Sequence, residues 1–436
     1  MGAVHRWVSC AAVLFLAGCF HPSYDHTLCG PHGECPSGLF CSAGLTCERG
    51  MMANSPDGGT TSPDGAPVDL SPICPSIALG NPQFNAAACA TPTSSLLQIT
   101  ADTSFDSDLG TSNAAGLTCA RVHNTGASVG DICVLAAASI VVQSGVVLSA
   151  HGTLPFALFA QSITIQGTVD VASHLGGQVG AGSTTTGCAR GSLPTGGGGG
   201  RGGDAAERGG PGGDDGSNIM TGATGGGSFS FNDITGGGCG GTRGGTGGAV
   251  GVPGSDGGNA TGGTGGGAVW IVSLSSDLII DAGAKINASG ASGIGGQHEG
   301  EGGAGGGAGG LILLQAPRIR LDPSAAIFAN GGHGGGGTGS NMGLSGFTFG
   351  TDGTDPVGAM SGGDGGAGGL DGGLGTGMPG GGDGGPGFPF TARDGLRGTT
   401  DAHGGGGGGG GPGAIRVVSA TDIAGPNVSP PPVVLK

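Results

Sequence analysis

Short apolar runs that alternate with polar residues, or that gather β-branched side chains, recur along the chain from residue 132 onward. Ile140-Val141-Val142 and Ile163-Thr164-Ile165 are two such runs, and Gly or Asp-Pro turns end them after four or five residues. This pattern is typical of strands. No stretch shows the apolar period of 3.6 residues that marks an amphipathic helix, so the pattern predicts an all-β protein.

The strand pattern repeats itself. Residues 139–151 match residues 162–174 at a shift of 162 − 139 = 23 without gaps, and residues 277–290 match residues 318–331 at a shift of 41. Short apolar strands precede most copies, at 155–161, 267–273, 310–316 and 413–419. Two or three strands in a repeat of this length suit one coil of a right-handed parallel β-helix, with coils about 4.8 Å apart.

Glycine dominates three long insertions between the repeats, at 175–266, 291–309 and 332–412, and supplies 111 of the 436 residues. Some of these glycines are phased by three, a period that suits extended polyproline-II-like strands packed side by side. Such phasing also arises by chance in glycine-rich sequence. Ordered bundles and flexible loops are therefore both open interpretations.

The predicted fold is all-β: a right-handed parallel β-helix interrupted by long glycine-rich insertions and preceded by a small disulfide-rich module. The predicted segments are a lipoprotein signal peptide at 1–18, a lipidated cysteine with a cysteine-rich module at 19–47, a Pro/Asp/Gly linker at 48–72, an N-terminal cap region at 73–131, the β-helix at 132–429 and a Pro-rich tail at 430–436.

The first residues have the features of an export signal. His5 and Arg6 precede an apolar run at 7–16 that is too short to span a membrane, and small residues follow it. Leu16-Ala17-Gly18-Cys19 resembles the bacterial lipobox, in which the cysteine is acylated and the chain is cut just before it. The alternative is an ordinary signal peptide that happens to contain Cys19.

The lipobox resemblance implies that Cys19 carries fatty-acyl groups, whose several chains would give a stable membrane attachment. In lipoproteins of this kind an Asp after the cysteine retains the protein at the inner membrane. Phe20 stands there in this chain. The resemblance therefore implies a lipid-anchored protein of the outer membrane, on its periplasmic or cell-surface side.

Ten of the 12 cysteines remain when Cys10, in the signal, and Cys19 are set aside. An even number in an exported chain favours disulfides, although His32 leaves a zinc site open within the first group. Four of them recur every six residues, four more could close a second small unit, and the last two could close a glycine-rich insertion. In that order they are Cys29, Cys35, Cys41 and Cys47; Cys74, Cys89, Cys119 and Cys133; and Cys188 and Cys239.

The formal charge is −16, and loss of Arg6 with the signal peptide would make it −17. Lys285 and Lys436 are the only lysines, and basic residues form no cluster. Binding to nucleic acid needs such a cluster, so the charge pattern argues against it. The partners expected are the membrane, through the lipid anchor, and surface polysaccharide or another envelope protein.

The lipobox, the six-spaced cysteines, the PDGG linker and the apolar strands before glycine tracts together resemble glycine-rich surface lipoproteins of myxobacterial type. The apolar repeats also resemble the pectin-lyase-type right-handed β-helix, a fold shared by polysaccharide lyases, glycosidases and adhesins. Fold alone does not choose among these functions.

Catalysis on a polysaccharide would need paired carboxylates on one strand face. Asp170, Asp277, Asp281 and Asp322 lie in the repeats, but Asp281 and Asp322 match each other at a turn, where Asp accepts backbone N–H groups. Arg318 and Arg320, the only close pair of basic residues in the repeats, are expected to face solvent.

Two patterns suggest metal binding, and both have simpler explanations. Asp256, Asp364 and Asp383 stand in GxDGG sequences similar to calcium-binding glycine repeats, but glycine replaces the apolar residue that those repeats need. His151 and His174 occupy equivalent repeat positions and are expected to be turn residues. Three more histidines, His298, His333 and His403, lie near or within glycine tracts. We expect no metal site and no cofactor, with calcium as the one possible exception.

The function expected from the sequence is that of a non-catalytic outer-membrane surface lipoprotein with a structural, adhesive or polysaccharide-contacting role. A carbohydrate-active β-helix enzyme, similar to a polysaccharide lyase or glycosidase, is the alternative.

Overall fold

A computed structural model gives the conformation of most of the chain. The described residues are 96–122, 131–183, 188, 192–216, 221–224, 236–247, 260–339, 348–360, 365–370, 380–399, 403–421, 423 and 425–435, together with three short strands nearer the N-terminus. The chain divides into two compact units, Met1–Asp69 and Leu70–Lys436. Within the described part every element is a strand, and no helix there has the length and apolar character needed to cross a membrane.

The first unit contains a small antiparallel sheet. Strands β1 (Thr27–Leu28) and β2 (Phe40–Cys41) both pair with β3 (Thr46–Glu48). This sheet falls in the predicted cysteine-rich module, whose cysteine side chains lie outside the described residues.

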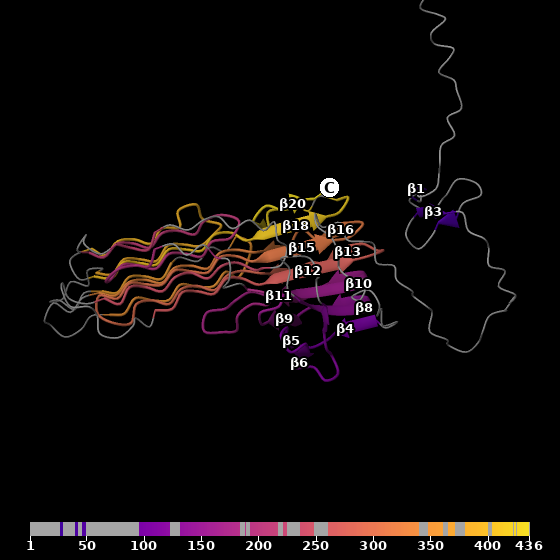
Figure 1. The fold of residues 1–436 in the computed structure, drawn as a ribbon, viewed down its shortest axis with the longest axis horizontal. Coiled ribbons are helices and arrows are strands. Elements are labelled where there is room, and N and C mark those ends of the chain that lie inside the picture. The colour runs from indigo at the N-terminus through magenta and orange to yellow at the C-terminus, as the bar shows by residue number, and fades with distance from the viewer. Residues whose placement is uncertain are drawn as a thin grey trace, which may run out of the picture. The chain divides into compact units, whose positions relative to one another are not determined.

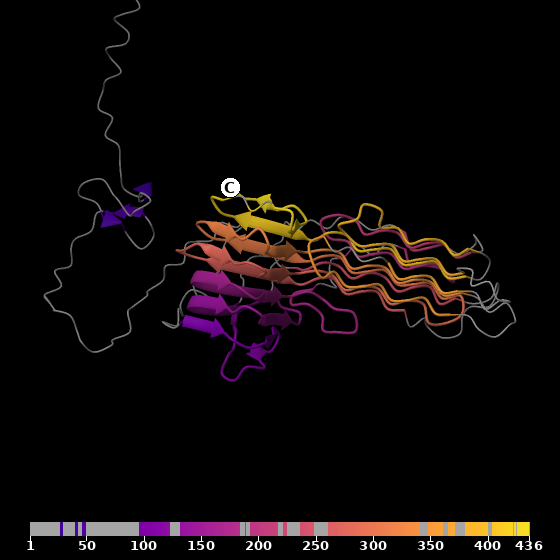
Figure 2. The ribbon, with the colours of Figure 1, turned by 180° about the vertical axis from the view of Figure 1, so that it is seen from behind.

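The second unit is built on two sheets (Figures 1 and 2). The ten-stranded sheet comprises β4 (Leu96–Ile99), β7 (Ala120–Val122), β8 (Ile132–Val142), β10 (Phe156–Ile165), β12 (Ala268–Ser273), β13 (Leu278–Ile280), β15 (Leu311–Gln315), β16 (Ile319–Leu321), β18 (Ala414–Val418) and β20 (Val433–Val434). The seven-stranded sheet comprises β5 (Thr103–Asp106), β6 (Thr111–Ser112), β9 (Val147–His151), β11 (Thr168–Asp170), β14 (Lys285–Asn287), β17 (Ala326–Phe328) and β19 (Val428–Ser429).

Strand pairing follows the sequence repeats over most of its length. Ile140 of β8 pairs with Ile163 of β10, a separation of 163 − 140 = 23 residues, and Leu278 of β13 pairs with Ile319 of β16, a separation of 41. Like residues therefore stack on like residues. The Ser162 hydroxyl even donates to the equivalent Ser139 hydroxyl at 2.9 Å.

The inward faces of the two sheets share one apolar core. Ile140 and Ile163 of the ten-stranded sheet belong to the same buried cluster as Val169, Ile286 and Ile327 of the seven-stranded sheet. Alternate residues of the ten-stranded sheet, among them Phe159, Trp270 and Leu313, form a second buried cluster on its other face. Burial on both faces explains why these strands read as continuous apolar runs.

The predicted right-handed parallel β-helix is wrong. The strands form two separate sheets, each made mixed by an antiparallel pair, β7 with β8 in one and β5 with β6 in the other, and they do not close into coils. A coil needs short turns from strand to strand. Here the chain instead leaves the sheets through long glycine tracts that hydrogen-bond to one another and run away from the strands in layers (Figures 1 and 2).

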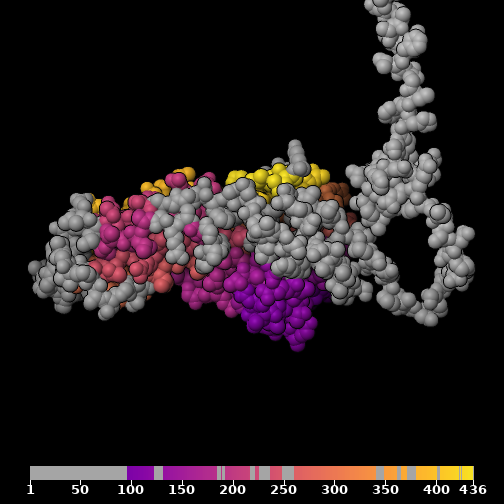
Figure 3. All heavy atoms as spheres, viewed as in Figure 1, coloured from indigo at the N-terminus to yellow at the C-terminus, as the bar shows by residue number. Residues whose placement is uncertain are grey.

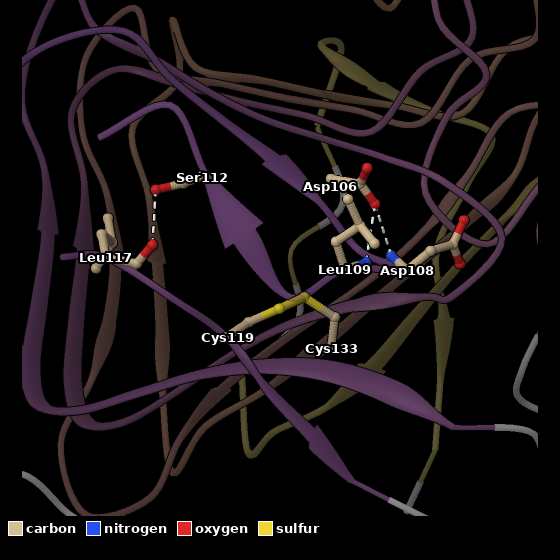
Figure 4. Close-up of a disulfide and its surroundings, with 7 residues drawn as sticks. All are labelled: Asp106, Asp108, Leu109, Ser112, Leu117, Cys119 and Cys133. Atoms are coloured by element: carbon tan, nitrogen blue, oxygen red, sulfur yellow. Dashed lines mark hydrogen bonds between the residues drawn. A yellow bond between two sulfur atoms is a disulfide. The ribbon is translucent and has the colours of Figure 1, made fainter. Parts of the chain in front are cut away.

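The predicted cap region contains short strands, β4 to β7, at the start of both sheets. In the view of Figure 3 this indigo segment forms the lower surface of the second unit. A disulfide between Cys119 and Cys133 joins it to β8, and both sulfur-bearing residues are buried (Figure 4). Beside it, the Asp106 carboxylate accepts the N–H groups of Asp108 and Leu109 and so closes the turn after β5.

Candidate functional site

The glycine tracts pack into one hydrogen-bonded body, which we call the glycine array. It comprises residues 196–205, 209–216, 221–224, 237–247, 260–267, 288–296, 301–310, 329–339, 348–355, 365–370, 380–388, 393–398 and 403–413. Of the two interpretations that the composition left open, ordered packing therefore holds for these residues.

The tract at 301–310 shows how the array is bonded. The N–H groups of 302, 305 and 308 donate to 237–247, those of 303, 306 and 309 to 403–413, and those of 304, 307 and 310 to 288–296. Its carbonyl groups accept from 196–205, 260–267 and 329–339. Because an extended strand with three residues per turn points each successive N–H in a new direction, one tract can bond to neighbours all round it.

Glycine is required because the backbones touch. A Cβ built on Gly305 would collide with the carbonyl oxygen of Arg201, and one on Gly407 with that of Ala304. Alanine occurs where a methyl group fits, as at Ala304 and Ala308, which are fully buried. The shape of the array is thus set by main-chain contacts, and few side chains take part.

A charged pair lies inside the array. Arg201 and Asp204 form an ion pair, and their side chains are only 5% and 2% exposed. The spacing of three residues places both on the same side of their tract. Asp204 also accepts the N–H of Gly209 at 3.0 Å, so this carboxylate holds two neighbouring segments together. The pair was not predicted, although the three-residue spacing in RGGD was a signal for it.

Glu301 is a second buried carboxylate that sequence analysis did not single out. Its oxygens accept the N–H groups of Ala260 at 3.1 Å, Gln297 at 2.7 Å and His298 at 2.9 Å. The His298 ring lies 3.1 Å from the same carboxylate. This arrangement closes the turn before the tract at 301–310.

A histidine between two carboxylates joins the seven-stranded sheet to the array. Nε2 of His174 lies 3.2 Å from Asp170, the last residue of β11, and Nδ1 lies 3.7 Å from Asp355 of the array. Hydrogen bonds to both carboxylates outweigh desolvation and raise the pKa of His174 from 6.5 to about 10. Desolvation would raise the pKa of Asp355, but hydrogen bonds from His174 and from the N–H groups of Leu175 and Ser292 hold it below its ordinary value.

Both ring nitrogens of His174 are engaged, so the imidazolium acts as a clamp and offers no lone pair to a metal or a substrate. Within the described part of the chain, no group of three or more His, Cys, Asp or Glu side chains is arranged to hold a metal ion.

The remaining acids of the repeats have separate partners. Asp277 accepts from Arg318 and from Arg320, at 3.0 and 2.6 Å, and both arginines are largely exposed. Asp281 accepts from Gln166, and Asp322 accepts from the N–H and hydroxyl of Ser324, as expected for a turn residue. The structure does not bring these carboxylates together as a catalytic pair.

His151 and His174 are not equivalent in the structure. The second strands of the two repeats pair Leu148 with Val169, a separation of 169 − 148 = 21 residues where the sequence match gives 23. The shorter Gln166-Gly167 turn causes the slip, and a slip of two keeps the inward side chains inward. His151 is consequently out of step with His174, and its Nδ1 lies 3.3 Å from the hydroxyl of Ser104.

The other candidate metal residues have structural contacts where they are described. Asp383 accepts the N–H of Gly368 at 2.7 Å. His333 is fully buried and its Nδ1 accepts the N–H of Gly387 at 2.8 Å, and His403 is fully buried in the array. Asp256 and Asp364 lie outside the described residues.

Two disulfides are present among the described residues, and all four of their cysteines are predicted candidates. Besides Cys119–Cys133, Cys188 is bonded to Cys239 and closes a glycine-rich segment 51 residues long. Four other candidates, Cys29, Cys35, Cys74 and Cys89, and the predicted lipidation site Cys19 lie outside the described residues. Cys41 and Cys47 belong to β2 and β3, but their side chains are not described.

Comparison with protein-family models, with curated proteins and with solved structures finds no match to this chain.

Proposed function

We propose that this chain is a non-catalytic, lipid-anchored surface protein whose glycine array is a rigid platform for contact with polysaccharide or another envelope component. The observation that carries the proposal is the three-residue bonding pattern of the tract at 301–310, which engages six neighbouring tracts. Such a body is ordered before it meets a partner, so binding loses little further conformational entropy.

The outside of the array favours a polar partner. Its rim carries exposed residues with hydroxyl and carboxylate groups, including Thr351, Asp352 and Thr354. Sugar hydroxyl groups can donate to both kinds of group and can also accept from the protein hydroxyls. A polysaccharide is therefore the partner that we favour.

The anchor is part of the same proposal. Removal of the signal at 1–18 and acylation of Cys19 would tether the mature chain to the outer membrane, as the likeness to myxobacterial-type surface lipoproteins implies. Metabolic labelling with a fatty acid tests this step. Label in the wild type and none in Cys19→Ser is the expected result, and equal label in both would contradict it.

The absence of catalysis is supported by the partners of the described acids. Asp170 is held by His174, Asp277 by two arginines and Asp281 by Gln166, which leaves each carboxylate in a structural contact. Release of reducing ends or unsaturated sugars from a polysaccharide would contradict the proposal and favour the enzyme alternative.

The binding experiment is co-sedimentation of the oxidised, delipidated protein with insoluble cellulose, chitin and β-1,3-glucan. We expect retention on at least one of these, lost in Gly305→Val, which breaks the array, and kept in Gly425→Ala, whose new methyl group has no closer neighbour than Val428 at 4.0 Å. Retention that survives Gly305→Val, or retention on none, would refute the array as a polysaccharide-binding surface.

A further inference from the structure

Side-chain oxygens replace main-chain carbonyls at the rim of the glycine array. The Ser192 and Thr195 hydroxyls accept the N–H groups of Thr224 and Thr221, at 2.9 and 3.1 Å. In return the N–H groups of Ser192 and Thr195 donate to the carbonyls of the same two residues. The two segments are therefore bonded to each other in both directions.

The same arrangement recurs between two other rim tracts. The Thr348 and Thr351 hydroxyls accept the N–H groups of Leu370 and Ala367, at 2.5 and 2.7 Å. The N–H groups of both threonines again donate back to the same partners. Two unrelated places in the sequence thus use hydroxyl residues three apart for one purpose.

A third rim position uses carboxylates three residues apart. Asp352 and Asp355 accept the N–H groups of Gly295 and Ser292, each at 2.8 Å. The other N–H groups of that tract at 290–296 bond to main-chain carbonyls of the array. The carboxylates therefore satisfy the one row of donors that the array itself does not.

Without these caps the N–H donors would be open to another glycine tract, because glycine tracts bind one another in both parallel and antiparallel directions. The tract at 301–310 runs parallel to 403–413, with 303 bonded to 405 and 306 to 408. It runs antiparallel to 288–296, with 304 bonded to 294 and 307 to 291. An open row of donors at the rim would accept another glycine tract much as an open sheet edge accepts another strand.

We propose that Ser192, Thr195, Thr348, Thr351, Asp352 and Asp355, which we call the rim caps, terminate the glycine array and prevent it from adding a tract from a second copy of the chain. A tract of a second copy is the partner that fits, because it carries carbonyl groups with the same three-residue period. The inference does not depend on what the array binds.

Sedimentation velocity over a range of concentrations tests the caps. Thr348→Val with Thr351→Val keeps the side-chain shape and removes the acceptors, and the double Ser variant retains them. Thr354→Val places the same methyl group on the same exposed tract at a residue with no side-chain hydrogen bond. We expect the mass of the double Val variant to increase with protein concentration. The wild type, the double Ser variant and Thr354→Val should show no such increase.

A double Val variant that sediments like the wild type would overturn the proposal, and so would growth in the double Ser variant or in Thr354→Val. Asp352→Asn retains the oxygen acceptor and removes the charge, so it should also match the wild type. Its association would mean that charge repulsion, and not capping, keeps copies apart. Slow amide hydrogen exchange at 301–310 serves as the check that a variant still forms the array. If the double Val variant loses this protection, Ser192→Ala with Thr195→Val provides the same test at another rim position.

Discussion

The carbonyl oxygen of Arg201 occupies the space that a Cβ on Gly305 would need. Gly305→Ala should therefore force two backbones apart and destabilise the array by about 1–3 kcal/mol, the usual cost of overpacking a tight interior. Gly425→Ala, where the added methyl group meets nothing closer than 4.0 Å, should change stability by less than about 0.5 kcal/mol. Denaturant unfolding of both variants measures the difference, and equal stability would contradict close packing.

The buried pair of Arg201 and Asp204 makes a second prediction. Arg201→Met leaves the Asp204 carboxylate buried without its counter-ion and should cost about 3–5 kcal/mol. Combining it with Asp204→Leu removes the stranded charge, so the double variant should be less destabilised than the sum of the single ones. A double-mutant cycle measures this coupling. Additive losses would show that the two charges do not act as a pair.

Sequence patterns identified the strands and most of their register. The β-branched runs at Ile140 and Ile163 predicted strands, and the shift of 23 matched these two residues to each other; they are paired and fully buried. The prediction that these strands close into a β-helix was wrong, because the same repeats suit any stack of parallel strands. What decides the architecture is where the chain goes between the strands, and glycine composition alone did not reveal that.

The polar contacts of the array were harder to predict because they join residues far apart in sequence. His174 was recognised, but nothing near it in sequence indicated Asp355, 181 residues away, as its second partner. The shift of His151 away from His174 depends on a turn that is two residues shorter in one repeat. The three-residue spacing of Arg201 and Asp204 predicts an ion pair only if their tract is ordered, and the sequence did not establish that order.

The two disulfides should differ in what they contribute. Replacing Cys119 and Cys133 by Ser opens a link of 14 residues and should cost about 3 kcal/mol. Replacing Cys188 and Cys239 opens one of 51 residues and should cost about 4 kcal/mol, because the longer loop gains more entropy in the unfolded chain. Unfolding midpoints of the two double variants test the order. The reverse order would mean that local packing outweighs loop entropy.

The His174 clamp should make stability depend on alkaline pH. The pKa of His174 is about 10 in the folded protein against 6.5 for a free histidine, so its contribution is fully present below pH 6.5 and is lost as the pH rises through about 10. The difference in unfolding free energy between wild type and His174→Gln should therefore shrink between pH 6 and pH 10.5. A constant difference would mean that the imidazolium charge does not stabilise the clamp.

The same clamp should weaken at the acid end through Asp355. Its pKa is lowered in the folded protein, so its contribution is present above its ordinary value of 3.8 and is lost as the pH falls through the lower, folded value. Asp355→Asn should therefore remove most of the acid sensitivity of this contact, while Asp394→Asn, at an exposed array residue with no side-chain partner, should not. Unfolding curves from pH 5 to pH 2 measure this, and equal acid sensitivity in all three proteins would contradict it.

Trypsin should distinguish two arginines that the sequence presents as similar, both in glycine-rich surroundings. Arg201 lies in the bonded part of the array and is 4% exposed, whereas Arg208 lies in the exposed turn between two tracts. Cleavage after Arg201 requires part of the array to open, so the rate there should follow the stability of the array. Mass spectrometry of brief digests should show cleavage after Arg208 first. Gly305→Ala should then speed cleavage after Arg201 much more than cleavage after Arg208, because only the first site is protected by the packing that this substitution disturbs.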